Sequence, residues 1–337
     1  MIWVTWRQFR AQAVTAAIGL VLLGAVLLAT GPGLAHDYAT GRAQCNGAGC
    51  HQFAEGYLNQ HQKALLELTL VVLVVPALLG LFWGAPLVAR ELDAGTHRLA
   101  WNQSVTRFRW LAVKLLLVGG SCAAVAGLTA WWVTRWSVPL DDASRLDPRL
   151  PLGMTFAARG VVPVAYSLFA FALGVAIGML TKRVLPAMAV TLVIFLVAQF
   201  GVGVLVRPHL APSHTSVAPV ASATLANFNV SRDGIRMNGD VPVRGAWLLS
   251  RSMVDASGAR VDVIPASLEH DPACDPTISK DITACLNLIA SQGYRQQSTY
   301  HLPSQFWRLQ WTEAGLYAVG TAGLVGFCFW WLHRRVV

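Results

Sequence analysis

Six long stretches without a charged side chain dominate this sequence. They comprise residues 11–36, 68–89, 115–134, 160–181, 184–206 and 314–332. Each is close to, or above, the roughly 20 residues that a helix needs to cross a bilayer core. Backbone amides find no water there, so a helix, whose hydrogen bonds are internal, is expected for each stretch. Only 13% of the residues are charged, against about 25% in soluble domains. The sequence therefore predicts an all-α polytopic membrane protein with six transmembrane helices.

The first apolar stretch follows a basic segment and resembles a signal peptide. It is longer than the roughly 7–15 residues of a signal sequence's apolar region, and a weak cleavage site follows it, so we expect a retained helix. Trp3, Trp6 and Phe9 recur at helical spacing beside Arg7 and Arg10, which is typical of an amphipathic helix in the headgroup layer. A frayed basic tail is the alternative. We assign residues 1–10 to an interfacial N-terminal helix and 11–205 to transmembrane helices one to five.

The net charge of +9 is placed unevenly along the chain. With the N-terminus inside, the inner connections and tails hold Arg7, Arg10, Arg90, Arg98, Arg107, Arg109, Lys114, Lys182, Arg183, Arg334 and Arg335, opposed by Glu91 and Asp93. This positive-inside bias predicts a multi-pass protein of the cell membrane with both termini in the cytoplasm. The lipid bilayer is then the partner that explains the charge, and nucleic acid is not needed.

The cysteines fit the same orientation. Cys45 and Cys50 fall in the first outer connection, and Cys274 and Cys285 in the largest one. Two local pairs on the oxidising side favour two disulfides, although a metal site or free thiols are alternatives.

The segments between the apolar stretches predict the remaining organisation of the chain. Residues 32–63 are polar and Gly-rich and predict an outer loop, and Pro76 and Pro86 predict a kinked second helix. Residues 206–308 are long enough for an extracellular domain of mixed secondary structure between helices five and six. Residues 309–337 then form helix six and a basic cytoplasmic tail. Gly174 and Gly178 form a GxxxG pattern, which suits packing within one subunit or between subunits.

Motifs for catalysis are missing from the sequence. It contains no GxxxxGK[ST] phosphate loop, no HExxH and no GxSxG, so we expect no enzyme activity, no bound cofactor and no metal. Four ionisable residues near the outer helix ends, Glu67, Arg135, Arg159 and Glu313, are candidates for a substrate path, because such groups face a wet cavity or a partner. The alternative is that they reach the outer interface or pair with one another.

The connection between helices two and three, residues 90–110, carries a more specific pattern. Gly95 can end one helix and Thr96 can begin a short second one. Glu91, three residues, Gly95 and Thr96 are followed by Arg107 and then by Lys114. This pattern resembles the corresponding connection of ABC-2 type transporter permeases, most closely the actinobacterial ones. The resemblance extends to the six-span topology and to the elaboration between helices five and six.

The resemblance implies that this chain is a permease subunit and that a separate ATP-binding cassette subunit binds ATP and magnesium. The connection would then be a coupling helix seated in a groove of that ATPase, through Arg90, Glu91, Asp93, Gly95, Thr96, Arg98, Leu99, Trp101 and Arg107. Six helices would form half of a pathway, so a permease homodimer is expected.

Two functions are compatible with these features. The first is ATP-driven export of a hydrophobic or amphipathic substrate, such as a drug, a peptide or a lipid. The second is a membrane sensor or structural protein whose extracellular domain binds a ligand or cell-envelope material. Recovery of a stoichiometric ATPase subunit with the chain would distinguish them.

Overall fold

The structure, a computed structural model, describes residues 2–46, 49–95, 106–144, 155–219, 225–231, 234–239, 243, 245–264, 274 and 282–334. The chain divides into two compact units. The first holds Met1–Ala143, Met154–Leu210 and Trp307–Val337, and the second holds Ala211–Phe306 with a short segment that begins at Ser144.

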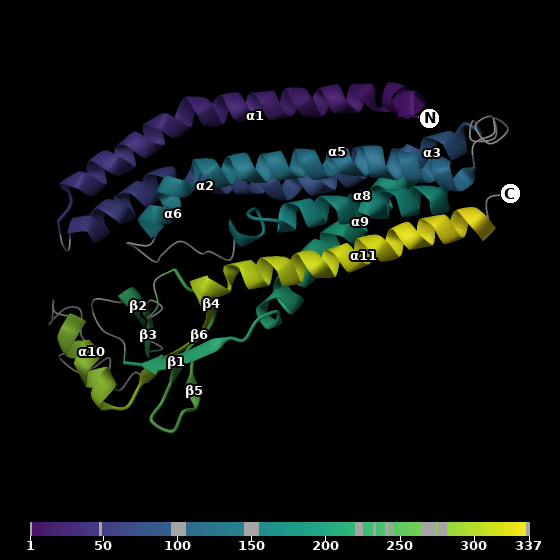
Figure 1. Ribbon diagram of the computed structural model, residues 1–337. Coiled ribbons are helices and arrows are strands. Elements are labelled where there is room, and N and C mark those ends of the chain that lie inside the picture. Colours follow the sequence, from purple (N-terminus) through teal and green to yellow (C-terminus); the bar gives the residue numbers. More distant parts are fainter. Residues whose placement is uncertain are drawn as a thin grey trace. The chain divides into compact units, whose positions relative to one another are not determined.

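The first unit is a bundle of long helices (Figure 1). Its elements are α1 (Ile2–Gln44), α2 (Gly49–Leu79), the π-helical turn η1 (Gly80–Gly84), α3 (Ala85–Asp93), α5 (Arg107–Trp136), α6 (Val138–Ser144), α8 (Val162–Thr181), α9 (Val184–Gly201), the π-helical turn η2 (Val202–Val206), the 3-10 turn η3 (Arg207–His209) and α11 (Phe306–Arg334). Within the described residues, six helical segments are long and apolar enough to cross a membrane, which confirms the predicted number.

The first two helices are longer than the sequence predicts. Residues 32–63 were expected to form a loop, but α1 continues to Gln44 and α2 begins at Gly49. The loop prediction is therefore wrong, because the polar residues that end the apolar stretch do not end the helix. At 1.5 Å per residue α1 is about 65 Å long, about twice the thickness of a bilayer core. It also has no break at residue 10, so the predicted interfacial segment and the first span form one helix.

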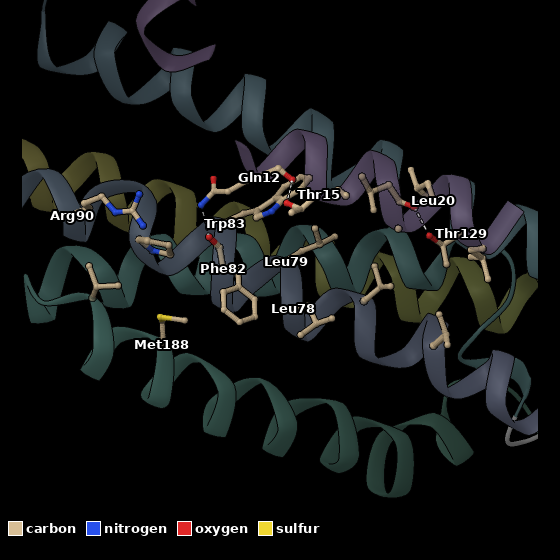
Figure 2. A pocket seen from close by; sticks show the side chains of 18 residues that line it. Gln12, Thr15, Leu20, Leu78, Leu79, Phe82, Trp83, Arg90, Thr129 and Met188 are labelled. Atoms are coloured by element: carbon tan, nitrogen blue, oxygen red, sulfur yellow. Dashed lines mark hydrogen bonds between the residues drawn. The ribbon is translucent and has the colours of Figure 1, made fainter. Parts of the chain in front are cut away.

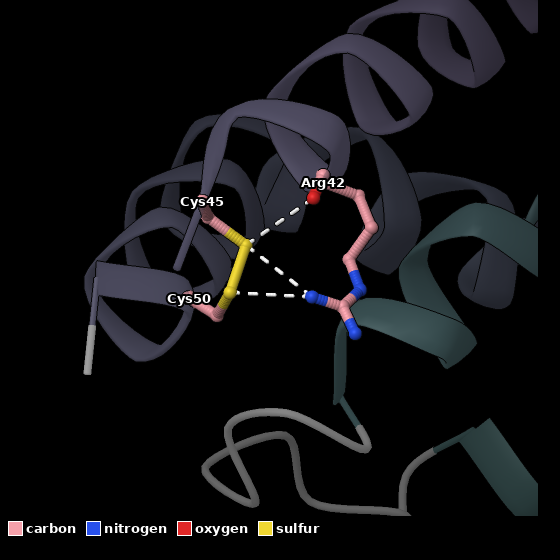
Figure 3. The surroundings of a disulfide bond; sticks show 3 residues. All are labelled: Arg42, Cys45 and Cys50. Atoms are coloured by element: carbon pink, nitrogen blue, oxygen red, sulfur yellow. Dashed lines mark hydrogen bonds between the residues drawn. A yellow bond between two sulfur atoms is a disulfide. The ribbon is translucent and has the colours of Figure 1, made fainter. Parts of the chain in front are cut away.

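Side chains hold these two extensions together. Tyr38 of α1 lies 6.2 Å from Phe53 and 5.7 Å from Tyr57 of α2, measured between ring centroids, and the Tyr57 hydroxyl donates to the Leu34 carbonyl at 2.8 Å. A disulfide joins Cys45 to Cys50 across the tip, and the Arg42 guanidinium lies against both sulfur atoms (Figure 3). The predicted outer pair is thus confirmed as a disulfide, set in a helical hairpin.

Glycines let α8 approach the second span closely. A Cβ atom on Gly174 would lie 2.5 Å from the Gly80 carbonyl oxygen and 2.6 Å from the Ala85 amide nitrogen. A Cβ atom on Gly178 would lie 2.5 Å from the Ala85 oxygen. The GxxxG pattern of α8 therefore packs within the subunit, against a second pair of glycines four residues apart, Gly80 and Gly84.

The second unit is a small α+β structure. Its strands are β1 (His214–Ala218), β2 (Leu225–Ser231), β3 (Gly234–Gly239), β4 (Trp247–Val254), β5 (Arg260–Val261) and β6 (Arg295–His301); it also holds the helix α10 (Ile282–Ser291) and the turn η5 (Pro303–Gln305). An antiparallel sheet has the order β1-β6-β4-β5, and β2 pairs with β3. The mixed secondary structure predicted for this segment is confirmed.

A buried cluster and a tight turn stabilise this unit. The cluster contains a second disulfide, Cys274 to Cys285, beside Leu286 and Ile289 of α10, and this confirms the other predicted cysteine pair. At the turn between β4 and β5, Asp255 accepts hydrogen bonds from the Ser257 hydroxyl at 2.6 Å and from the Ala259 amide at 3.0 Å. These hydrogen bonds stabilise the carboxylate and lower the pKa of Asp255.

Candidate functional site

A buried ion pair links α3 to α5 in the first unit. The Lys114 ammonium contacts the Glu91 carboxylate, and the two side chains are 3% and 13% exposed. Gln8 of α1 donates its amide to the same carboxylate oxygen at 2.9 Å. The ammonium also lies 4.8 Å from the centre of the Trp110 ring. We call these four residues, Gln8, Glu91, Trp110 and Lys114, the polar anchor.

The polar anchor explains the spacing of the sequence motif. Glu91 and Lys114 are 23 positions apart, yet their side chains meet, because α3 ends and α5 begins at the same end of the bundle (Figure 1). A charge buried in an apolar bundle is costly unless an opposite charge pairs with it. The two helices that flank the connection are therefore fixed to one another, and Gln8 adds α1 to the same group.

The two ends of the connection are defined by local backbone signals. After α3 ends at Asp93, Gly95 adopts a φ of +68°, a left-handed conformation that favours glycine. The Thr106 hydroxyl accepts a hydrogen bond from the Arg109 amide at 3.3 Å and caps α5, which begins at Arg107. Gly95 thus ends a helical stretch, as the sequence indicates.

Four further residues predicted for ATPase coupling, Thr96, Arg98, Leu99 and Trp101, lie outside the described residues. The predicted short helix that contains them lies there too. The described coupling candidates, Arg90, Glu91, Asp93, Gly95 and Arg107, all lie at the two helix ends that the polar anchor joins.

A cavity of about 500 Å³ lies beside the anchor (Figure 2). Its walls come from α1, α2, η1, α3, α5 and α9, and its lining is Gln12, Thr15, Ala16, Gly19, Leu20, Leu23, Val71, Val75, Leu78, Leu79, Phe82, Trp83, Pro86, Arg90, Val125, Thr129, Val184 and Met188. Most of these side chains are apolar, as is usual for small-molecule sites. Arg90 was predicted to contact the ATPase, and the structure places it on the wall of this cavity.

The polar side chains of the lining are mostly engaged by backbone groups. Pro86 has no amide hydrogen, so the carbonyl of Phe82, four residues earlier, lacks its α-helical donor. The Gln12 amide donates to that carbonyl at 2.9 Å. The hydroxyls of Thr15 and Thr129 donate to carbonyls of their own helices. Arg90 is therefore the one positively charged residue among those that line the cavity, and its guanidinium donors are not engaged by backbone carbonyls as those of Gln12, Thr15 and Thr129 are.

A comparison with protein families decides the identity. Residues 17–207, more than half of the chain, match the family described as ABC-2 membrane transporter related. The chain belongs to this family. The matched range contains Glu91, Trp110 and Lys114 of the polar anchor and all of the cavity lining except Gln12, Thr15 and Ala16. The searches of curated proteins and of solved structures returned no match.

This ABC-2 permease does not bring its four predicted path residues together. Glu67 is exposed and forms a 3.9 Å ion pair with Lys63, and Arg135 is exposed on α5. Arg159 pairs with Asp141. Glu313 is fully buried in α11. None of the four lines the cavity beside the polar anchor.

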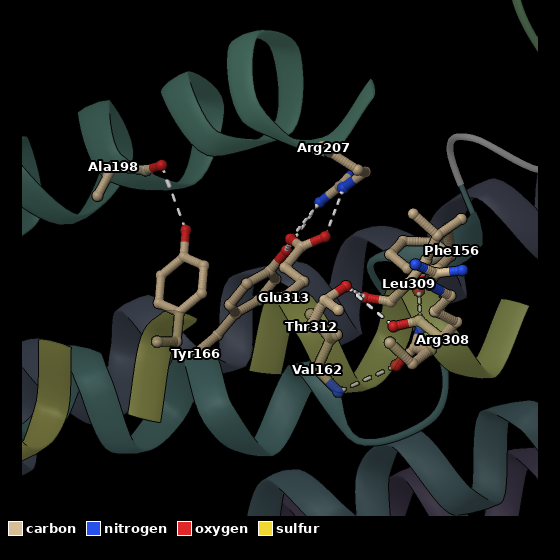
Figure 4. Close-up of polar contacts among 11 residues, drawn as sticks. Phe156, Val162, Tyr166, Ala198, Arg207, Arg308, Leu309, Thr312 and Glu313 are labelled. Carbon is tan, nitrogen blue, oxygen red and sulfur yellow. Dashed lines mark hydrogen bonds and ion pairs between the residues drawn. The ribbon is translucent and has the colours of Figure 1, made fainter. Parts of the chain in front are cut away.

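Glu313 belongs to a buried network at the other end of the permease bundle (Figure 4). Arg207 donates from Nε to Glu313 Oε2 and from Nη2 to Oε1, both at 2.8 Å, and Nη2 also donates to the Tyr166 hydroxyl at 2.8 Å. Tyr166 in turn donates to Glu313. Nearby, Gln310 accepts from the amides of Val161 and Val162. The network ties α8, the turn η3 and α11 together.

Sequence reasoning missed the partner of Glu313 and the cavity. Arg207 follows directly after an apolar stretch, and such a position signals a helix end as readily as a buried ion pair. The cavity needs residues from six segments, and their side-by-side arrangement is not visible in the sequence. Among the residues that the structure describes, no three His, Cys, Asp or Glu side chains come close enough to hold a metal ion.

Proposed function

We propose that this ABC-2 permease exports a hydrophobic or amphipathic substrate across the cell membrane, driven by a separate ATP-hydrolysing subunit. The polar anchor carries the proposal. It fixes α1, α3 and α5 at the connection where the family resemblance places ATPase contact. ATP and magnesium would be bound by the partner subunit, and this chain would have no enzyme activity of its own.

The anchor offers a route from the connection to the cavity. A force applied between Gly95 and Thr106 would reach α3 and α5 together, because Glu91 and Lys114 join them. Gln8 would transmit the same displacement to α1. These three helices form one side of the cavity, and Val184 and Met188 of α9 form another. Movement of the connection would therefore shift the α1, α3 and α5 walls of the cavity relative to the α9 wall.

We also propose that both termini face the cytoplasm and that two copies act together. The polar anchor end of the bundle carries the cations Arg7, Arg10, Arg90, Arg107, Arg109, Lys182, Arg183 and Arg334, which supports its cytoplasmic placement. The helices of one copy enclose this cavity only partly, which supports a second copy to complete the pathway.

Co-purification and ATPase assays test the proposal. The chain would be expressed with its ATPase subunit, isolated by a tag on the permease, and reconstituted in liposomes. We expect a stoichiometric complex whose ATPase activity falls severalfold in Glu91→Gln and in Lys114→Met, because each change leaves a buried charge unpaired. The double substitution should restore part of that activity. Glu67→Gln, which alters an exposed pair, is the matched control.

Two outcomes would contradict the proposal. Absence of any ATPase subunit from the purified chain would favour a sensor or structural role. A complex whose ATPase activity is equal in the wild type, Glu91→Gln and Lys114→Met would show that the polar anchor does not couple the subunits.

A further inference from the structure

The cavity beside the polar anchor has the depth of one membrane leaflet. Along α1 its wall runs from Gln12 to Leu23, which is about 16 Å at 1.5 Å per residue. The hydrocarbon core of a bilayer is about 30 Å thick, so this wall spans about half of it. The apolar walls at this depth, including Leu20, Leu79 and Val75, match a single alkyl chain.

A smaller and more polar pocket adjoins the cavity at its Arg90 end. Its volume is about 140 Å³, and it shares Gln12, Pro86 and Arg90 with the larger cavity. Thr5, Gln8, Phe9, Leu87 and Glu91 complete its lining. The two spaces together join a small, more polar compartment to a larger apolar one, as an amphiphile joins a headgroup to an alkyl chain.

The charges of these two spaces favour an anion. No acidic side chain is among the residues that line the larger cavity. The carboxylate in the smaller pocket, Glu91, is already engaged by Lys114 and Gln8. Arg90 is exposed, and within the described ranges its guanidinium forms no hydrogen bond or ion pair. A planar guanidinium with free donors suits a phosphate or carboxylate.

We infer that the two spaces bind one anionic single-chain amphiphile, with its phosphate at Arg90 and its alkyl chain along α1 and α2 toward Thr129. Figure 2 shows Arg90 at one end of the lining and Thr129 at the other. The inference deepens the proposed function, because it names the class of substrate. It rests on the proposed function only in treating this ligand as a transported substrate. Binding itself requires neither the ATPase subunit nor transport.

Photolabelling of the full-length chain tests the inference. The probe is a long-chain alkyl phosphate with a diazirine in its chain, and the matched probe is the same chain carrying a zwitterionic phosphocholine. Both are added to the purified protein in nanodiscs of zwitterionic lipid, and labelled peptides are identified by mass spectrometry. We expect the phosphate probe to label the peptides that contain Gln12–Leu23 and Val71–Phe82. The zwitterionic probe should label them about tenfold less at equal concentration.

Two pairs of variants separate the site from the surrounding lipid. Arg90→Gln should reduce labelling by the phosphate probe about tenfold, as expected when a hydrogen bond to a charged group is lost. Arg109→Gln, an exposed cation at the same end that does not line the cavity, should leave it unchanged. Gly19→Leu should abolish labelling, because a Cβ atom at Gly19 meets nothing within 4 Å and the side chain fills the cavity. Gly120→Leu also projects into open space, but outside the cavity, and should have no effect.

Three results would overturn the inference. Equal labelling by both probes, or equal loss in Arg90→Gln and Arg109→Gln, would mean that charge does not select the ligand. Labelling that persists in Gly19→Leu would mean that the probe sits in the surrounding lipid. Gel filtration of every variant confirms that the fold is intact. If the phosphate probe failed to label the wild-type chain while ATPase coupling was normal, only the ligand class would be rejected. If the wild-type chain was labelled as expected but no ATPase subunit was recovered with it, only the proposed function would be rejected.

Discussion

Glu313 and Lys114 are charged side chains enclosed by the helix bundle, and each finds its ionic partner on another segment. Glu313 has no solvent-exposed surface and receives three hydrogen bonds, two from Arg207 and one from Tyr166. Such a pair stabilises a fold weakly compared with apolar packing, but losing one partner leaves a buried charge that neither water nor protein compensates. The network therefore fixes which helix ends meet.

The first prediction concerns this network. Arg207→Gln and Glu313→Gln should each lower the free energy of unfolding by about 3–5 kcal/mol, the usual cost of breaking a buried pair from one side. The double substitution should cost much less than the two single costs together, because no unpaired charge remains. Thermal and denaturant unfolding of the detergent-solubilised chain measures this.

The exposed pair Lys63 and Glu67 supplies the control, because its side chains are 90% and 66% exposed. Removing either should cost about 0–1 kcal/mol. Strict additivity in the Arg207 and Glu313 cycle would show that the two groups do not interact.

Single residues also show what the sequence could reveal. Glu91, Gly95 and Lys114 were recognised from a local pattern, and the cysteine pairs from their proximity along the chain. The contact of Glu91 with Gln8 crosses 83 positions, and that of Glu313 with Arg207 crosses 106. Nothing in the local sequence indicates which distant group will meet a buried charge.

At the scale of elements, apolar stretches predicted where helices cross the membrane but not where they end. The α1–α2 hairpin continues past its apolar stretches because most of the added residues tolerate a helix, and the Tyr38, Phe53 and Tyr57 rings hold it closed. The partner of the α8 glycines was also unpredicted. Gly80 and Gly84 lie in a stretch that reads as an ordinary apolar span, and only the packing gives them a role.

The second prediction is that the hairpin is helical in solution. Backbone amides from Gly33 to Gln44 and from Phe53 to His61 should exchange with deuterium slowly, because each is hydrogen-bonded within a helix. Cys45→Ser with Cys50→Ser should increase exchange near the tip, since a disulfide that closes a loop of this length contributes about 2 kcal/mol. Fast exchange throughout residues 36–61 would restore the loop interpretation.

The third prediction tests the contact between α8 and η1. Gly174→Ala should lower the free energy of unfolding by about 1–3 kcal/mol, because its Cβ atom would meet the backbone of Gly80 and Ala85, which cannot rotate away. Gly315→Ala, where a Cβ atom meets nothing within 4 Å, should be neutral or slightly stabilising, as alanine is the better helix former. Thermal unfolding in detergent compares the two. Equal stability would mean that α8 and η1 are farther apart than described.

At the scale of the whole molecule, the unequal distribution of charge between the two ends of the bundle supports the proposed orientation. The end with the polar anchor carries the α3–α5 connection and the α8–α9 turn, where Lys182 and Arg183 lie. Both disulfides belong to segments that connect helices at their opposite ends, in keeping with an oxidising compartment. The free cysteines, Cys122 and Cys328, are buried within helices. Charge and cysteine chemistry thus point to the same orientation independently.

The fourth prediction follows from this agreement. In intact cells, a membrane-impermeant maleimide should label Gln292→Cys in the second unit, whereas Thr106→Cys at the start of α5 should react only after the membrane is permeabilised. Both positions are exposed to solvent, so a difference in labelling reports the side of the membrane. The unsubstituted chain should react only after reduction, because four of its cysteines are in disulfides and two are buried. Labelling of Thr106→Cys in intact cells would place the α3–α5 connection outside, where no ATPase could reach it. The same result would remove the polar anchor from any coupling role while leaving the fold and the cavity as described.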